Sequence, residues 1–231
     1  MNYLHSGFFF MHLRLLITLL LPVTLSAQKT FTGTIDYRLT NTDTSLDVRV
    51  QAIFIPGRIR FHMQPVKVPA GADIKEELLI LDFEQAAIFR IKDKEKIVER
   101  ENIGGENSKQ DLPALQPADT SQILGQPVRT YSSGWIEKTE VKGTDTIKSQ
   151  VNASFAYASH LSYPIPDSLS REQMVPLFTN GHVCLGFAIR VRSAALRFDL
   201  LSRAWQLRPG KTRKLSKLFR FPKDYTQRQK D

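Results

Sequence analysis

The sequence predicts a mainly β fold of the α+β type, in which antiparallel strands form a single sheet accompanied by one or two short helices. Two observations predict the strands: apolar and polar residues alternate along several stretches, and turn-forming residues separate those stretches. In an extended chain, this alternation places apolar residues on one face and polar residues on the other. The third observation is that helix signals are few, so strands account for most of the chain.

The clearest strand pair lies near the start of this β-rich region. Residues 31–40 alternate, and residues 46–54 alternate again with Val48, Val50 and Phe54 on the apolar side. The pair Pro56-Gly57 then suits the centre of a type II turn, since proline presets the first φ angle and glycine accepts the positive second one. The alternation resumes at once, so we expect an antiparallel hairpin.

Further stretches carry strand patterns along the rest of the chain. They are 78–83 and 86–91, which form a hairpin turning at 84–85, then 128–131, 135–141, 151–163, 183–191 and 196–200. A short helix is expected toward Phe178, because residues 170–173 have capping-box spacing and Asp167 or Ser168 could also cap it. The polar segment 102–120, which contains Gly104-Gly105, is expected to be a long loop.

The N-terminal residues predict export. Residues 13–27 consist of Arg14, an apolar core, a proline break and the small pair Ser26-Ala27, which is the layout of a cleavable signal peptide. The apolar core is too short to span a bilayer. We expect cleavage after Ala27 and a periplasmic or secreted protein that begins at Gln28. No cysteine lies near this site, so no lipid attachment is expected there.

Basic residues are concentrated at the C-terminal end. Residues 190–231 hold thirteen Lys and Arg against three Asp and Glu, whereas the whole chain has a net charge of +9. The remainder is therefore close to neutral. This distribution predicts three parts: a signal peptide at 1–27, a β-rich domain at 28–202 and a basic tail at 203–231.

Two interpretations of the tail stay open. It is either a flexible, solvated segment or a basic amphipathic turn, in which Leu215, Leu218 and Phe219 share one helical face. The second interpretation predicts contact with anionic envelope surfaces. The residues expected to make that contact are Lys211, Arg213, Lys214, Lys217 and Arg220. Nucleic acid is not expected as a partner of an exported protein.

Four short motifs follow one another through the body of the chain. They are 31–37 directly after the signal peptide, 52–61 around the Pro-Gly turn, 79–89, and 123–131. This set resembles the GLPGLI-type and related exported families of Gram-negative bacteria over roughly residues 30–200. The resemblance implies a LolA-like lipoprotein-carrier fold, which is an incompletely closed antiparallel β-barrel with helices on its concave side. It also implies an envelope protein with an apolar groove. The chain departs from these families at Pro127-Val128 and in its basic tail.

The sequence predicts no catalytic residue, cofactor or metal site. It contains no nucleophile elbow, zinc-protease motif, phosphate loop or dinucleotide fingerprint. His62 lies on the polar side of its strand, and His182 with Cys184 supplies two metal-capable groups where a site needs three or more. Cys184 alternates with apolar residues, so we expect a buried thiol, with pairing to a partner chain as the alternative.

These observations favour a non-catalytic exported envelope protein that binds lipid or another apolar ligand in a half-barrel groove. The alternative is a structural or interaction module that meets anionic envelope surfaces through the basic tail. A third hypothesis, a hydrolase, requires His160 or His182 to meet a carboxylate in a cleft.

Overall fold

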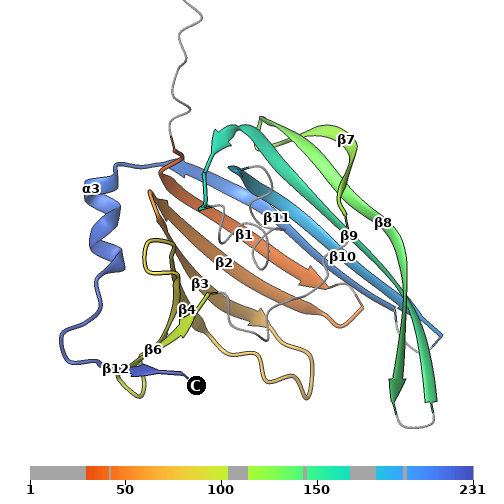
Figure 1. The fold of residues 1–231 in the computed structure, drawn as a ribbon, viewed down its shortest axis with the longest axis horizontal. Coiled ribbons are helices and arrows are strands. Elements are labelled where there is room, and N and C mark those ends of the chain that lie inside the picture. The colour runs from red at the N-terminus through yellow and green to blue at the C-terminus, as the bar shows by residue number, and fades with distance from the viewer. Residues whose placement is uncertain are drawn as a thin grey trace, which may run out of the picture.

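A computed structural model describes residues 30–41, 43–103, 114–142, 145–166, 181–194 and 197–230. The signal peptide expected at residues 1–27 and the short helix expected toward Phe178 therefore fall outside the described residues. The described strands form one sheet of twelve, in the order β12-β6-β5-β4-β3-β2-β1-β11-β10-β9-β8-β7. The sheet is strongly curved (Figure 1), which confirms the predicted mainly β fold with a single curved sheet.

The strands fall into two groups that meet where β1 pairs with β11. The first group is β1 (Gly33–Asn41), β2 (Leu46–Ile55), β3 (Arg58–Lys67), β4 (Glu77–Asp82), β5 (Ala87–Lys92) and β6 (Ile97–Asn102). The second group is β7 (Gln116–Ile123), β8 (Gln126–Lys142), β9 (Asp145–Ser162), β10 (His182–Ser193) and β11 (Arg197–Pro209). Neighbouring strands are antiparallel except for β12 (Thr226–Gln229), which runs parallel to β6.

The Pro-Gly hairpin forms as the sequence predicts. Gly57 has a φ of 74°, and β2 and β3 pair on either side of it. The Tyr163 hydroxyl lies 2.7 Å from the carbonyl oxygen of Ile55 and 2.9 Å from that of Arg58. The side chain that directly follows β9 therefore holds the turn of the first group of strands, and the curl of the sheet brings the two together.

The two faces of the curled sheet bury different clusters. The inner face carries the larger cluster, to which Ile35, Phe54 and Leu81 contribute from the first group of strands. Leu185 of β10, which lies at a β-bulge between Cys184 and Gly186, also belongs to this cluster. The outer face carries Ile53, Ile55, Ile80, Phe89 and Val98. Because residues alternate between faces, β2 and β4 contribute to both clusters: Phe54 and Leu81 to the inner one, Ile53 and Ile80 to the outer one.

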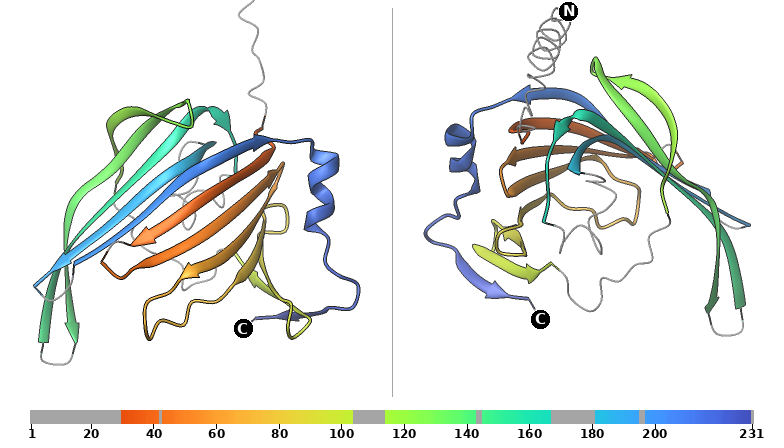
Figure 2. Two further views of the ribbon diagram at one scale, coloured as in Figure 1. Left: turned by 180° about the vertical axis from the view of Figure 1, so that it is seen from behind. Right: turned by 45° about the horizontal axis from the view of Figure 1, so that its top comes forward.

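The C-terminal segment covers the outer cluster. The chain leaves β11, forms α3 (Thr212–Leu215) and the 3-10 turn η4 (Ser216–Phe219), and then runs on to β12. Phe219 is buried in the outer cluster, and Leu215 and Phe221 pack beside it. Figure 2 shows this segment lying outside the curl of the sheet. No described helix is long and apolar enough to cross a membrane.

The structure corrects two boundaries expected from the sequence. Arg203–Pro209 belong to β11, because Ala204 and Leu207 continue the inner face, so the predicted tail does not start at residue 203. Residues 116–120 belong to β7 rather than to a loop. β7 is an edge strand exposed on both faces up to Ile123, so it shows no alternation.

Candidate functional site: an apolar groove on the inner face

The inner face of the sheet contains a groove of about 360 Å³. It extends over seven consecutive strands, from β5 through β1 to β10. This volume lies within the usual range of small-molecule sites. Nine apolar side chains line it: Leu39, Val50, Phe54, Phe61, Met63, Leu79, Leu81, Ile88 and Phe187. Four further lining residues carry polar atoms: Tyr37, Arg90, Cys184 and Ser202.

Strand register explains why these side chains meet. Phe61 on β3 lies directly opposite Ala52 on β2 and Leu79 on β4. Leu79 in turn lies opposite Arg90 on β5. Directly opposed residues point to the same face of a sheet. The alternation that the sequence shows on each strand therefore adds up to a continuous apolar floor.

Most of the apolar lining is only half-buried within the described residues. Phe54 and Leu81 are 2% exposed and form the floor. Leu39, Val50, Phe61, Met63, Leu79, Ile88 and Phe187 are of intermediate exposure. Apolar side chains in this state can still gain free energy if a ligand removes them from water.

Tyr37 and Cys184 are fixed to the backbone at one side of the groove. The Tyr37 hydroxyl donates a hydrogen bond to the carbonyl oxygen of Cys184 at 2.8 Å. The Cys184 thiol donates to the carbonyl oxygen of Gly186 at 3.1 Å. Burial raises the pKa of Tyr37 well above its usual value and raises the pKa of the Cys184 thiol to about 12. Both groups are therefore neutral at physiological pH and add no charge to the groove.

Arg90 is the one charged residue in the lining of this groove. Its guanidinium pairs with the carboxylate of Glu77 on β4. The Arg90 side chain is 38% exposed and that of Glu77 is 26% exposed, so the pair remains in contact with water. The groove thus combines an apolar interior with one polar pair, an arrangement that matches an amphiphile better than a fully polar molecule.

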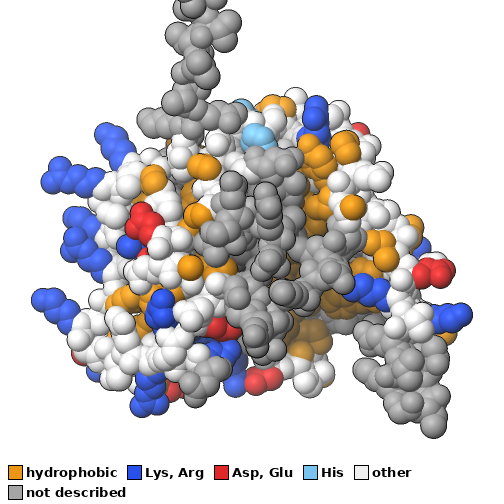
Figure 3. Space-filling model, viewed as in Figure 1, with side chains coloured by type: hydrophobic (Ala, Val, Ile, Leu, Met, Phe, Trp, Pro, Cys, Tyr) orange, Lys and Arg blue, Asp and Glu red, His pale blue; other side chains and the backbone are white. Residues whose placement is uncertain are grey.

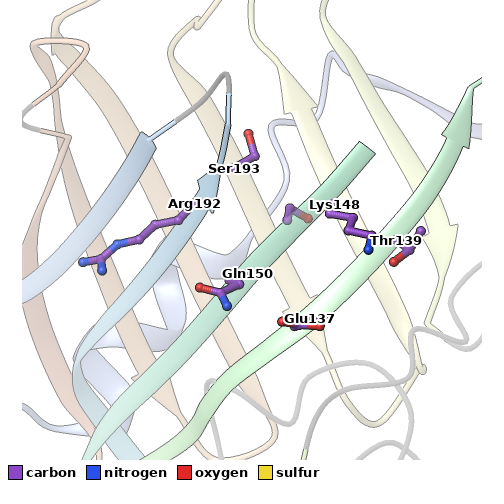
Figure 4. Close-up of a pocket in the computed structure, with 7 residues that line it drawn as sticks. Glu137, Thr139, Lys148, Gln150, Arg192 and Ser193 are labelled. Carbon is purple, nitrogen blue, oxygen red and sulfur yellow. The ribbon is translucent and has the colours of Figure 1, made fainter. Parts of the chain in front are cut away.

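A second cavity, of about 350 Å³, lies on β8, β9 and β10 and is polar (Figure 4). Its charged residues Glu137, Lys148 and Arg192 are exposed to solvent. Arg192 lies 4.5 Å from the centre of the Trp135 ring, in a cation–π contact. No buried polar group is directed into this cavity from the described lining residues, so it has the character of an open surface depression.

A third cavity, of about 690 Å³, is lined by charged residues at the ends of β3, β4 and β5. Its charges pair with one another: His62 lies 2.6 Å from Glu76, and Lys75 lies 3.0 Å from Asp73. The Lys75–Asp73 pair is exposed to solvent, as is the Glu76 carboxylate. A further open hollow of about 450 Å³ lies over β7 to β11, and six of its thirteen lining residues are apolar. In the inner groove nine of thirteen are apolar, so we take that groove as the candidate site.

The histidines do not form a catalytic arrangement among the described residues. His160 is exposed and its Nε2 lies 2.5 Å from the Gln126 side-chain oxygen. His182 Nδ1 has no hydrogen-bond partner among them. The hydrolase hypothesis requires one of these histidines to meet a carboxylate. Within the described ranges, neither His160 nor His182 forms an ion pair with one. No group of three or more potential metal ligands occurs there either.

The five basic residues singled out from the sequence are all exposed. Lys211, Arg213, Lys214, Lys217 and Arg220 lie on the outer side of α3 and η4 or directly beside them. The apolar residues expected to share one helical face with these cations differ in burial. Phe219 is buried against the sheet, whereas Leu218 is 46% exposed. The cations are therefore distant from the groove, on the opposite face of the sheet.

Comparison with known proteins gives no family assignment: no family model and no curated protein matches the chain. Among solved structures, the chain is similar to an outer membrane lipoprotein-sorting protein domain from Vibrio parahaemolyticus. The two share 10% sequence identity, with a TM-score of 0.30, over 84% of this chain and 92% of the other.

The sequence pattern does not predict that Cys184 and Phe187 both line the inner groove. Simple alternation puts these residues on opposite faces of β10. The pairing with β9 shifts between Cys184 and Gly186, which marks a β-bulge, so both residues line the groove. The one local signal of this bulge is Gly186, because a glycine inside a strand often marks a bulge or a close approach of another backbone. A Cβ at this position would lie 3.0 Å from the carbonyl oxygen of Ser202 on β11.

Proposed function

We propose that the mature protein acts in the cell envelope or outside the cell, where it binds an amphiphile with a long apolar chain, without chemical conversion. The apolar groove on the inner face is the observation that carries this proposal. The export pattern of residues 13–27 supports the location. The resemblance to exported families supports the same class of protein.

The free energy available in the groove favours an acyl chain. Each methylene group that leaves water for an apolar environment contributes about 0.8 kcal/mol. The half-buried side chains from Leu39 on β1 to Phe187 on β10 offer such an environment over several strands. An extended apolar chain fills a groove of this kind better than a compact ligand.

The polar end of the ligand is expected to lie beside Arg90. The guanidinium can accept a carboxylate or phosphate as a further partner, because an arginine has five N–H donors. The partial exposure of Arg90 and Glu77 leaves room for this contact at the groove surface. Fatty acids and acidic lipids are therefore the preferred ligand class.

Titration with a fluorescent fatty acid tests the proposal. The mature protein is expected to bind it saturably, and Met63→Gln combined with Leu79→Gln should weaken binding at least tenfold by making the floor polar. Val66→Gln is the matched control, since Val66 lies on the same strand as Met63 but is 53% exposed and outside the groove. Equal affinity in all variants would overturn the proposal.

Organic extraction of the purified protein provides a second test. Mass spectrometry should find acidic lipid or fatty acid in extracts of the unaltered protein and much less in extracts of the groove variant. If the protein carries no lipid and takes up none from added fatty acid, the groove does not serve as a lipid site and the proposed function is wrong.

A further inference from the structure

The outer face of the sheet carries three arginines in one line. Arg38 on β1 lies directly opposite Arg49 on β2 and, on its other side, directly opposite Arg203 on β11. All three side chains are exposed. Arg49 shares its face of β2 with Ile53, which belongs to the outer cluster. The three guanidinium groups therefore form a row on the outer face.

Such a row destabilises the folded protein, because like charges directly opposite each other on a sheet repel. Asp47 relieves part of the repulsion by accepting hydrogen bonds from Arg38 at 3.0 and 2.7 Å. Arg38 lowers the pKa of Asp47, and Arg49 adds to that effect. Neither Arg49 nor Arg203 forms a salt bridge within the described ranges. The row thus has more positive charge than its own carboxylate neutralises.

The C-terminal segment adds positive charge to the same face. Six Lys and Arg lie in the stretch from Lys211 to Lys223, with no Asp or Glu among them. Leu215 and Phe219 pack against the outer cluster and fix the orientation of α3 and η4. The basic side chains consequently project away from the sheet, and Figure 3 shows them on the side of the molecule where α3 lies.

Two large apolar side chains are exposed on this face. Trp205 is 54% exposed and two residues beyond Arg203, and Leu218 is 46% exposed between Lys217 and Phe219. Tryptophan and leucine beside cations are typical of surfaces that meet the interface of a membrane, where the rings and aliphatic groups enter the headgroup region. A soluble polyanion would offer no such environment to Trp205 and Leu218.

We propose that this outer face docks the protein on an anionic lipid bilayer. The docking surface consists of Arg38, Arg49, Arg203, Trp205 and the exposed side of the α3–η4 segment. It goes beyond the proposed ligand groove, which opens on the opposite face of the sheet. The sequence indicates only the C-terminal cations, whereas strand register adds the arginine row. Because Leu215 and Phe219 face the protein, contact takes place through the cations, Leu218 and Trp205 rather than through insertion of the whole amphipathic turn.

Sedimentation with lipid vesicles tests this surface in the full mature protein. Vesicles with 30% phosphatidylglycerol should bind the protein, and phosphatidylcholine vesicles should not. Each cation removed should weaken binding about fivefold, so Arg49→Gln with Arg203→Gln should weaken it roughly 25-fold. Lys214→Gln with Lys217→Gln should have a similar effect. The matched control is Lys75→Gln with Lys94→Gln, which removes the same charge from the third cavity.

The control separates a docking surface from an effect of net charge. An equal loss of binding in the Lys75 and Lys94 variant would overturn the proposal, as would retention of full binding in both outer-face variants. The groove variant Met63→Gln with Leu79→Gln should still bind vesicles. Vesicle binding therefore tests the docking surface separately from fatty-acid binding, which tests the groove.

Tryptophan fluorescence distinguishes a bilayer from a soluble polyanion. Binding to anionic vesicles should shift the emission to shorter wavelength, and Trp205→Phe should remove most of that shift while Trp135→Phe should retain it. If polyphosphate competes fully and vesicles cause no Trp205-dependent shift, the face binds anionic polymers and the bilayer proposal is wrong.

Discussion

The Tyr37 hydroxyl donates a hydrogen bond to the main-chain carbonyl oxygen of Cys184 across 2.8 Å, although 147 positions separate the two residues in sequence. The bond joins β1 to β10 over the intervening strand β11, since β1 pairs with β11 and β11 pairs with β10. It lies at one side of the apolar groove, to whose lining both residues contribute. The groove is therefore held in shape by a contact between the two halves of the sheet.

Replacement of Tyr37 by phenylalanine should destabilise the protein by about 1 kcal/mol, because the ring is retained and one hydrogen bond is lost. Urea unfolding followed by circular dichroism measures this change. Tyr131→Phe is the matched control, since the Tyr131 ring packs against that of Tyr157 on β9. An equal loss of stability in both variants would show that the hydrogen bond from Tyr37 to Cys184 does not stabilise the fold.

The Cys184 thiol should be unreactive in the folded protein. It is buried, and burial raises its pKa to about 12, so thiolate is scarce at pH 8. Reaction with a disulfide reagent should be at least a hundredfold slower in buffer than in 6 M urea. A rapid reaction in buffer would contradict the buried position, and disulfide-linked dimers in the purified protein would do so as well.

Stability should fall at alkaline pH. Burial raises the pKa values of Cys184, Tyr37 and Tyr163 in the folded protein above their ordinary values of 9.0 and 10.0. Burial of these neutral groups therefore contributes fully to the free energy of unfolding below about pH 9. Above that pH the groups ionise more readily in the unfolded chain, so stability falls as pH rises toward the folded pKa values, by up to about 1.4 kcal/mol per group and pH unit. Urea midpoints between pH 7 and 11 measure the decline. The double variant Tyr37→Phe with Cys184→Ala should flatten it, and an unchanged slope would contradict this cause.

Phe219 should anchor the C-terminal segment. It is 6% exposed in the outer cluster, so Phe219→Ala should destabilise the protein by about 3 kcal/mol and expose residues 210–230 to proteases. Leu218→Ala is the matched control. The Leu218 side chain lies next to Phe219 but is 46% exposed, so its removal should change the free energy of unfolding by less than about 0.5 kcal/mol. Similar effects of the two variants would indicate that η4 does not pack as described.

Export should remove the first 27 residues. The pattern of residues 13–27 predicts that protein recovered from the envelope or medium starts at Gln28. N-terminal sequencing of each cell fraction measures this directly. Recovery of the unprocessed chain in the cytosolic fraction would contradict the proposed location, whatever the groove binds.

Much of the first half of the sheet was predictable from sequence because its signals are local. The alternation at Val48, Val50 and Phe54 and the Pro56-Gly57 turn each depend on a few neighbouring residues. The bulge before Gly186 was not predictable from local pattern, since it depends on how β10 pairs with β9. The groove and the arginine row likewise require knowledge of which strands are neighbours.

The most direct test of the apolar groove is photo-crosslinking with a fatty acid that carries a photoreactive group near the end of its chain. After irradiation of the mature protein, mass spectrometry of peptides should place the label on inner-face residues such as Met63, Leu79 and Phe187. An excess of unlabelled fatty acid should abolish the labelling. Labels confined to Trp205 and Leu218 on the outer face, or spread evenly over the surface, would contradict the account.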